Sequence, residues 1–310
     1  MPSETWFERS KGLIESANDV SHYKALRIRP KVEHRVRRPY SITADILAFR
    51  RCSRQYGFFA VRGYVPAQAT QLYFGIVIHE VLDRAHRQYR GLIEGKPARV
   101  PTDDEIQEYH RVVTEALRAR GIRPYSRKAE ESAKEYLKRF NSQYGPNLYP
   151  RVRDTEHKLR ADMKDFYLHG VVDVLARSED DSKPGQMEIW DYKGSHKVPA
   201  GSEEMENYEF QMRVYAELYR RKNGEYPARA ILCFLGEENL QEMVVEVRFD
   251  SKSTSEAMRI FTTTVKKIEH RREVDDWTPP PKMPSRETCG ACDIRWDCST
   301  AKSEFPMRYP

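Results

Sequence analysis

A change of sequence period near Glu156 constrains the fold more than any other feature. From this point apolar and β-branched residues recur with the two-residue period typical of β-strands, in the runs HKLRADM, FYLHGVVDVLAR and QMEIWDYK. The last two runs are joined by SEDDSKPG, in which Pro184 and Gly185 favour a turn. We therefore expect these two strands to form an antiparallel hairpin.

Amphipathic segments before the strands predict helices. Ser41 can cap a helix that reaches Cys52, with apolar residues on one side. Residues 73–90 predict a second helix, which carries His79 in its first turns. The charged, amphipathic segment 102–149 predicts two surface helices, and thus a helical insertion.

A further helix is expected after the strands, over residues 203–224, with Gly224 suited to its C-terminal cap. Two more strand-like runs, ARAILCFLGE and EMVVEVRFD, follow it. This order indicates an α/β fold in which helices flank a central mixed sheet. The expected organisation is an N-terminal arm over residues 1–40 and one domain over 41–310, with a helical insertion at about 100–150, the core at about 154–250 and a cysteine segment at 278–300.

The five cysteines are unevenly spaced. Cys289, Cys292 and Cys298 form C-x2-C-x5-C in a polar segment, Cys52 lies far upstream, and Cys233 falls in an apolar run typical of a core. Because the chain shows no export signal, we expect reduced thiols rather than a disulfide framework. The three clustered thiols predict a ligand site with Cys52 as the fourth ligand, for zinc or an iron–sulfur cluster. Three unrelated cysteines are the alternative.

The net charge of +6, from 53 basic and 47 acidic residues, is modest, but it is clustered. The segment RIRPKVEHRVRR includes Arg35, Arg37 and Arg38 and only one acid. Such an arm can neutralise phosphates and bind nucleic acid in a salt-dependent way, and a solubilising arm is the equal alternative. No apolar run approaches the ~18 to 20 residues that cross a bilayer, and the start lacks an apolar signal region, so we expect a cytoplasmic protein with no membrane partner.

Asp173 and Asp191 fall on the two strands of the expected hairpin, and Lys193 lies on the same strand face as Asp191. Two carboxylates can bind Mg²⁺ or Mn²⁺, and a lysine beside the ion can orient a water or stabilise a phosphoryl-transfer transition state. An ordinary surface ion pair is the alternative for Asp191 and Lys193. His79 is either a metal ligand or a hydrogen-bonded core histidine. Glu156 is a weaker auxiliary candidate, and Glu188 would face the opposite side of its strand.

Several motifs then follow one another in a fixed order along the chain. They are His79 in GIVIHE, Asp173 in HGVVDVL, Asp191 and Lys193 in IWDYKGS, and Gln211 with Tyr215 in QMRVY. In this order the sequence resembles the RecB-like branch of the PD-(D/E)xK nuclease superfamily, which has a restriction-endonuclease-like core. The resemblance implies that His79, Asp173 and Asp191 bind the metal and that Lys193 is the catalytic lysine. Gln211 and Tyr215, four apart on one helical face, would meet the DNA or the edge of the active site.

The cysteines fit the same resemblance. Cys52, Cys289, Cys292 and Cys298 match the [4Fe-4S] clasp of AddB-type nucleases and of the CRISPR-associated RecB-like nucleases of spacer acquisition. Such a clasp would join the N- and C-terminal segments of the domain and restrict its unfolded state, and zinc is the alternative occupant. The resemblance covers roughly residues 40 to 300, and Ser53 follows Cys52 where many relatives have proline.

The resemblance implies a metal-dependent DNA nuclease, an exonuclease on single strands or DNA ends that hydrolyses phosphodiesters with a metal-activated water. Such modules work in DNA repair, recombination, CRISPR adaptation or phage defence, alongside a helicase or another partner protein. A non-catalytic nucleic-acid-binding or scaffold protein that keeps the fold and the metal clasp is the second hypothesis. The intact acids and lysine argue against it.

Overall fold

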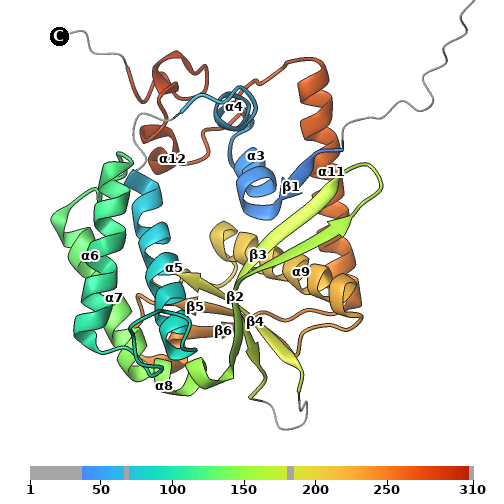
Figure 1. The fold of residues 1–310 in the computed structure, drawn as a ribbon. Coiled ribbons are helices and arrows are strands. Elements are labelled where there is room, and N and C mark those ends of the chain that lie inside the picture. The colour runs from blue at the N-terminus through green and yellow to red at the C-terminus, as the bar shows by residue number, and fades with distance from the viewer. Residues whose placement is uncertain (1–36, 66–69, 180–184, 307–310) are drawn as a thin grey trace, which may run out of the picture. The chain divides into compact units, whose positions relative to one another are not determined.

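The computed structural model describes residues 37–65, 70–179 and 185–306 of the chain. Contacts divide the chain into Met1–Arg37 and Arg38–Pro310, and the architecture below is that of the second unit. A six-stranded sheet organises it, with the strand order β1-β3-β4-β5-β6 and β2 paired to the other edge of β3 (Figure 1). Arg35 and the other residues of the basic arm up to position 36 lie outside the described residues.

Strand β3 is the branch point of the sheet. Its whole length pairs with β2 as an antiparallel hairpin. Its other edge is shared, because parallel β1 pairs with Tyr167 to His169 and antiparallel β4 pairs with Val174 to Arg177. Between these two segments, residues 170–173 of β3 pair with neither β1 nor β4, and Asp173 is the last of them. The strands are β1 (Pro39–Ser41), β2 (Val152–Asp162), β3 (Tyr167–Arg177), β4 (Met187–Lys193), β5 (Arg229–Phe234) and β6 (Val244–Glu246).

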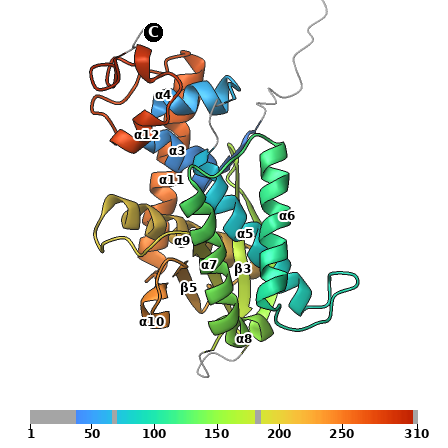
Figure 2. The ribbon, with the colours of Figure 1, turned by 90° about the vertical axis from the view of Figure 1, so that its left-hand side faces the viewer.

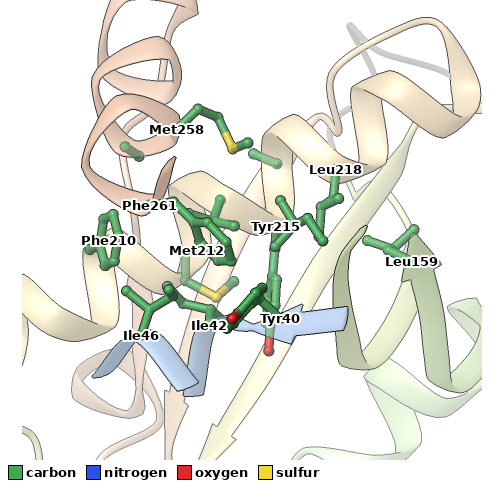
Figure 3. Packing of buried hydrophobic residues seen from close by; sticks show 14 of the residues in the cluster. Tyr40, Ile42, Ile46, Leu159, Phe210, Met212, Tyr215, Leu218, Met258 and Phe261 are labelled. Carbon is green, nitrogen blue, oxygen red and sulfur yellow. The ribbon is translucent and has the colours of Figure 1, made fainter. Parts of the chain in front are cut away.

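Helices cover both faces of the sheet (Figure 2). One face packs against α5 (Thr70–Tyr89), α6 (Asp103–Ala119), α7 (Arg127–Gln143) and α8 (Gly145–Leu148) through a buried cluster that includes Trp190 and Tyr192. The other face packs against α9 (Glu203–Asn223), α11 (Ser251–Glu273) and the π-helix η1 (Ile42–Leu47). In that second cluster, Met212 and Tyr215 of α9 lie among side chains of η1 and α11 (Figure 3). The sheet is therefore the middle of three layers.

Short elements complete the described part of the chain. Cys52 has an extended backbone, with a φ of −157°, which separates two short helices. The short elements are α3 (Ala48–Arg51), α4 (Ser53–Tyr56), η2 (Gly57–Val61), η3 (Tyr149–Arg151), α10 (Leu240–Met243), α12 (Arg286–Gly290) and η4 (Arg295–Asp297). In Figure 1, α4 and α12 lie next to each other, although more than 200 residues separate them.

Local signals in the sequence explain most helix ends. The side chain of Ser41 accepts a hydrogen bond from Ala44 N and starts the predicted helical segment, which Cys52 ends. Gly224 closes α9 in the left-handed conformation, with φ of 87°, as predicted. The predicted α/β class, mixed sheet and β3–β4 hairpin are confirmed. Within the described ranges, the structure contains no helix with the length and apolar character needed to span a bilayer.

Candidate active site

Asp173 and Asp191 lie on adjacent strands at the point where β3 and β4 begin to pair. Regular pairing runs only from Val174 onward, and the backbone N–H of Tyr192 donates to Oδ2 of Asp173 at 2.6 Å. The carboxylate of Asp173 thus takes the place of a backbone acceptor in the ladder, which fixes its position. Asp173 and Asp191 are 9% and 3% exposed, so both carboxylates are largely removed from water.

Lys193 lies on the same face of β4 as Asp191, as the two-residue spacing predicted. Its ammonium pairs with Oδ2 of Asp191, donates to Oε1 of Gln211 at 3.2 Å and lies 4.2 Å from the centre of the Tyr208 ring. Nε2 of Gln211 in turn donates to Oδ1 of Asp191 at 2.8 Å and to the hydroxyl of Tyr215 at 3.2 Å. Gln211 therefore holds the acid and the lysine in one fixed arrangement.

Two glycines let the helices approach the sheet closely at this site. A Cβ at Gly170 would lie 2.6 Å from Cε1 of Tyr215, so the Tyr215 ring rests directly on β3. A Cβ at Gly194, the residue after Lys193, would lie 2.7 Å from Cδ1 of Phe74 on α5. Because only glycine leaves this room, the two positions set how near α9 and α5 come to the carboxylates.

His79 and Glu156 bring two further ligand side chains to Asp173. Nδ1 of His79, on α5, lies 3.0 Å from Oδ1 of Asp173. Among the described residues, His79, Glu156 and Asp173 each offer one ligand atom within 4.8 Å of the others. Glu156 faces Asp173 across the β2–β3 hairpin and has a φ of 50°, a left-handed conformation that is costly for a non-glycine residue. Asp191 is not part of this three-residue set, although it lies beside it.

The site concentrates negative charge, with Asp173 and Asp191 buried and Glu156 exposed at its edge. Partial desolvation of its carboxyl raises the pKa of Glu156, and the neighbouring Asp173 adds to the rise. Burial also raises the pKa of Asp191, an effect that Lys193 opposes and Asp173 strengthens. For His79, burial favours the neutral ring, but the carboxylate of Asp173 prevails and raises the pKa to about 9. Three carboxylates against one lysine and one imidazole form an arrangement that favours a bound cation.

Glu188 is also a buried acid on β4, but it faces away from the site, as predicted. Its carboxylate accepts hydrogen bonds from Arg229 at 2.6 Å and from Arg151 at 3.1 Å. It also accepts one from the indole of Trp190 at 3.1 Å. Every charge is compensated there, so Glu188 is part of the core packing and no ligand candidate.

The four predicted cysteine ligands line one small cavity between α4 and the segment that follows α11. Cys52, Cys289, Cys292 and Cys298 are all buried around it, whereas Cys233 lies in the sheet core. Burial raises the pKa of Cys52 and of Cys289. Hydrogen bonds from Ser53 to Thr278 O, at 2.7 Å, and from Gln55 to Thr288 O, at 3.1 Å, join the two chain segments around the cavity.

Of the three arginines of the arm that are predicted to bind nucleic acid, Arg37 and Arg38 are described. The guanidinium of Arg38 lies 3.6 Å from the carboxylate of Glu269 on α11, and its backbone oxygen accepts from Tyr167 N. Arg37 is half-buried. The structure thus places Arg38 at the start of the domain, in contact with α11 and β3.

Residues 44–299 match the family model of the PD-(D/E)XK nuclease superfamily, and the chain belongs to this superfamily. No curated protein sequence matches the chain. A crystal structure of a provisionally named exonuclease from Eubacterium rectale is similar at 13% identity and a TM-score of 0.49, over 87% of this chain and 89% of that one. The structure of SSO0001 is similar at 13% identity and a TM-score of 0.34, over 82% and 96%. These distant likenesses add nothing to the family assignment.

Proposed function

We propose that the chain is a metal-dependent deoxyribonuclease, an exonuclease that hydrolyses phosphodiesters in single strands or at DNA ends. The observation that carries the proposal is the convergence of Asp173, Asp191 and Lys193 where β3 and β4 meet, beside two further ligand side chains. A surface ion pair, the alternative for Asp191 and Lys193, does not account for carboxylates that are both less than 10% exposed.

The side chains next to Asp173 fit a hard divalent cation. His79, Glu156 and Asp173 offer an imidazole nitrogen and carboxylate oxygens in one place, and Asp191 adds a carboxylate from the neighbouring strand. Mg²⁺ or Mn²⁺ held there would polarise a phosphoryl oxygen and lower the pKa of a bound water. The raised pKa values of Glu156 and Asp191 support this assignment, because a cation would stabilise both ionised carboxylates.

Lys193 is held where a positive charge can act on the substrate. Its contacts with Asp191, Gln211 and the Tyr208 ring keep the ammonium beside the carboxylates. There it would offset the negative charge that develops on the phosphoryl oxygens during hydrolysis. Gln211 and Tyr215 are positioning residues in this proposal, because Gln211 orients Asp191 and Lys193 through hydrogen bonds and Tyr215 accepts one from Gln211.

The cysteine cavity is proposed to hold a [4Fe-4S] cluster that joins Cys52 to the C-terminal segment. What supports this is the gathering of four buried thiols from two distant segments around one cavity. Protein purified without oxygen should be brown and contain iron and acid-labile sulfide. Colourless protein with stoichiometric zinc would contradict the cluster and keep the four ligands.

The nuclease proposal is tested with labelled single strands that are free at both ends, blocked at the 5′ end, blocked at the 3′ end, or circular. With Mn²⁺ or Mg²⁺, the protein should degrade linear strands from one end and spare the circle. Asp173→Asn should abolish cleavage, and full activity of this variant would overturn the assignment. Tight binding of DNA without cleavage of any form would favour the non-catalytic hypothesis.

A further inference from the structure

A cationic groove runs along α11, away from the carboxylates. It is walled by α3 and the start of α4 on one side, by α11 on the other, and by Pro280 and Pro281. Five of its lining side chains are Arg, Lys or His, and none of the described residues that line it is acidic. Its polar lining includes Arg50, Arg259, Thr263, Lys267, His270 and Arg271.

The α11 residues of the groove form one stripe at helical spacing. Arg259, Thr263 and Lys267 follow one another at intervals of four, and His270 and Arg271 continue the stripe. The stripe is about 18 Å long at 1.5 Å per residue. The opposite side of α11 is apolar and buried against the sheet. The stripe is therefore the solvent side of a helix that is fixed by its core contacts.

Two of the groove cations have no acid to neutralise them. Within the described ranges, Arg50 and Lys267 make no ion pair, whereas Arg259 is paired with Glu256. Arg271 is paired with the carboxylate of Asp276, at 3.7 Å, and also donates to the backbone oxygen of Asp276 and to the hydroxyl of Thr278. Uncompensated cations in a concave surface are an electrostatic site for a polyanion.

A contact of Arg50 links the groove to helix α9, which carries Gln211 of the candidate active site. The guanidinium of Arg50, at one end of the groove, lies 5.3 Å from the centre of the Phe210 ring. Phe210 directly precedes Gln211, whose side chain accepts a hydrogen bond from Lys193. A chain of phosphates in the groove would thus pass α9 next to the residue that positions the proposed catalytic groups.

We propose that this groove binds the sugar–phosphate backbone of one DNA strand whose end lies at Asp191 and Lys193. The inference rests on the proposed nuclease function and extends it, because it assigns a strand-binding surface outside the metal and lysine site. Arg50 and Lys267 would each contact a phosphate, and Thr263 would donate a hydrogen bond to a phosphate oxygen.

The test uses Arg50→Gln, Lys267→Gln and the double variant, with Lys266→Gln as the control. Lys266 is an exposed lysine on the same helix, next to Lys267 in sequence, but it does not line the groove. Binding of a fluorescent oligothymidylate is measured by anisotropy with EDTA present, so that the strand is not cut, over a range of salt concentrations. Thermal unfolding of each variant verifies that it is folded.

Each lost phosphate contact should weaken binding roughly five- to tenfold at 50 mM salt and make the slope of log K against log salt shallower by about 0.7. The double variant should therefore lose about 1.4 of slope, and Lys266→Gln should resemble the wild type. With Mn²⁺, the double variant should show a raised KM and an unchanged kcat.

A double variant that matches Lys266→Gln in both affinity and salt slope would overturn the groove assignment. The proposed function would then still stand if the wild type cuts DNA. Conversely, a wild type that binds DNA but cuts none would overturn the nuclease proposal, while the binding data would still decide the groove.

Discussion

The two ends of β4 each bury an acid, and the surroundings of these acids differ. At the start of the strand, Glu188 is fully compensated by Arg151, Arg229 and Trp190, and although burial opposes ionisation, the hydrogen bonds and charges of the arginines lower its pKa. At the end of the strand, Asp191 has one lysine, crowds against Asp173, and has a raised pKa. Buried acids on one strand are thus charge-compensated at one end and left with an excess of negative charge at the other.

The difference lies in whether the buried charge is balanced. A balanced cluster such as that of Glu188 is destabilised by any removal, because a buried partner is left unpaired. An unbalanced cluster such as that of Asp173 and Asp191 carries an electrostatic cost, which a bound cation would offset. Charge excess in a buried place thus separates the candidate site from structural ion pairs on the same strand.

A large loss of cleavage is expected from Lys193→Met, which removes the charge and keeps the length of the side chain. Because the ammonium would stabilise the transition state, the single-turnover cleavage rate should fall by about 10² to 10³-fold. Lys193→Arg, which keeps the charge, should lose less. If Lys193→Met cleaves DNA at the wild-type rate, another group must supply the catalytic positive charge.

Glu188→Gln should instead affect stability. It leaves the Arg151 and Arg229 cations without their buried carboxylate, so the free energy of unfolding should fall by about 3 kcal/mol. Urea unfolding measures this change, and cleavage by the folded fraction should match the wild type. A variant as stable as the wild type would show that Glu188 is not a structural ion-pair centre.

The same contrast recurs on α5, where His79 and His86 lie two turns apart. His86 is fully buried beside the hydroxyl of Tyr192, at 2.9 Å, and burial lowers its pKa to about 3. Because the unfolded chain takes up the proton near pH 6.5, His86 contributes stability above that pH and loses it as the pH falls toward 3. Stability should fall by up to about 1.4 kcal/mol per pH unit below 6.5 from this group. His86→Gln should weaken the pH dependence of the free energy of unfolding below pH 6.5. An unchanged pH dependence would show that His86 does not cause it.

The pKa of His79 is raised to about 9, which predicts the opposite sign. In the metal-free protein the ring is protonated at neutral pH, and its pairing with Asp173 stabilises the fold below about pH 6.5 and is lost as the pH rises through 9. Metal binding must displace that proton, so Mn²⁺ affinity should increase by up to about tenfold per pH unit between pH 7 and 9. Calorimetric titration in buffers of different ionisation enthalpy would detect the released proton. His79→Asn should remove this proton release.

Local sequence rules predicted one part of the site well. The strand period placed Asp191 and Lys193 on one face and Glu188 on the other, because alternation in a strand depends on neighbouring residues alone. The turn signal at Pro184 and Gly185 placed Asp173 next to Asp191. The structure confirms these placements.

Features that depend on distant contacts were not predictable in this way. Glu156, from the sequence only a weaker auxiliary candidate, joins His79 and Asp173 with a positive φ and a position across the hairpin, neither of which has a local signal. The partners of Glu188 come from positions 37 residues before it and 41 after it. Strand β1 has only three residues, and pairing with β3 alone defines it.

Helix α11 was missed although its sequence carries a signal. Asp250 and Ser253 form a capping box at its start. Its buried residues then recur at helical spacing, at positions 254, 257, 258, 261, 264, 265 and 268. The same helix presents the cationic stripe, so a helical prediction there would also have revealed the groove face.

The most direct test of the central claim compares Asp191→Asn with Glu188→Gln in one pair of assays, Mn²⁺-dependent cleavage of single-stranded DNA and urea unfolding. We expect Asp191→Asn to lose cleavage by at least about 10²-fold while its stability stays within about 1 kcal/mol. We expect the reverse for Glu188→Gln, with stability lost and cleavage retained. Cleavage by Asp191→Asn at the wild-type rate would show that Asp191 is not needed for the reaction.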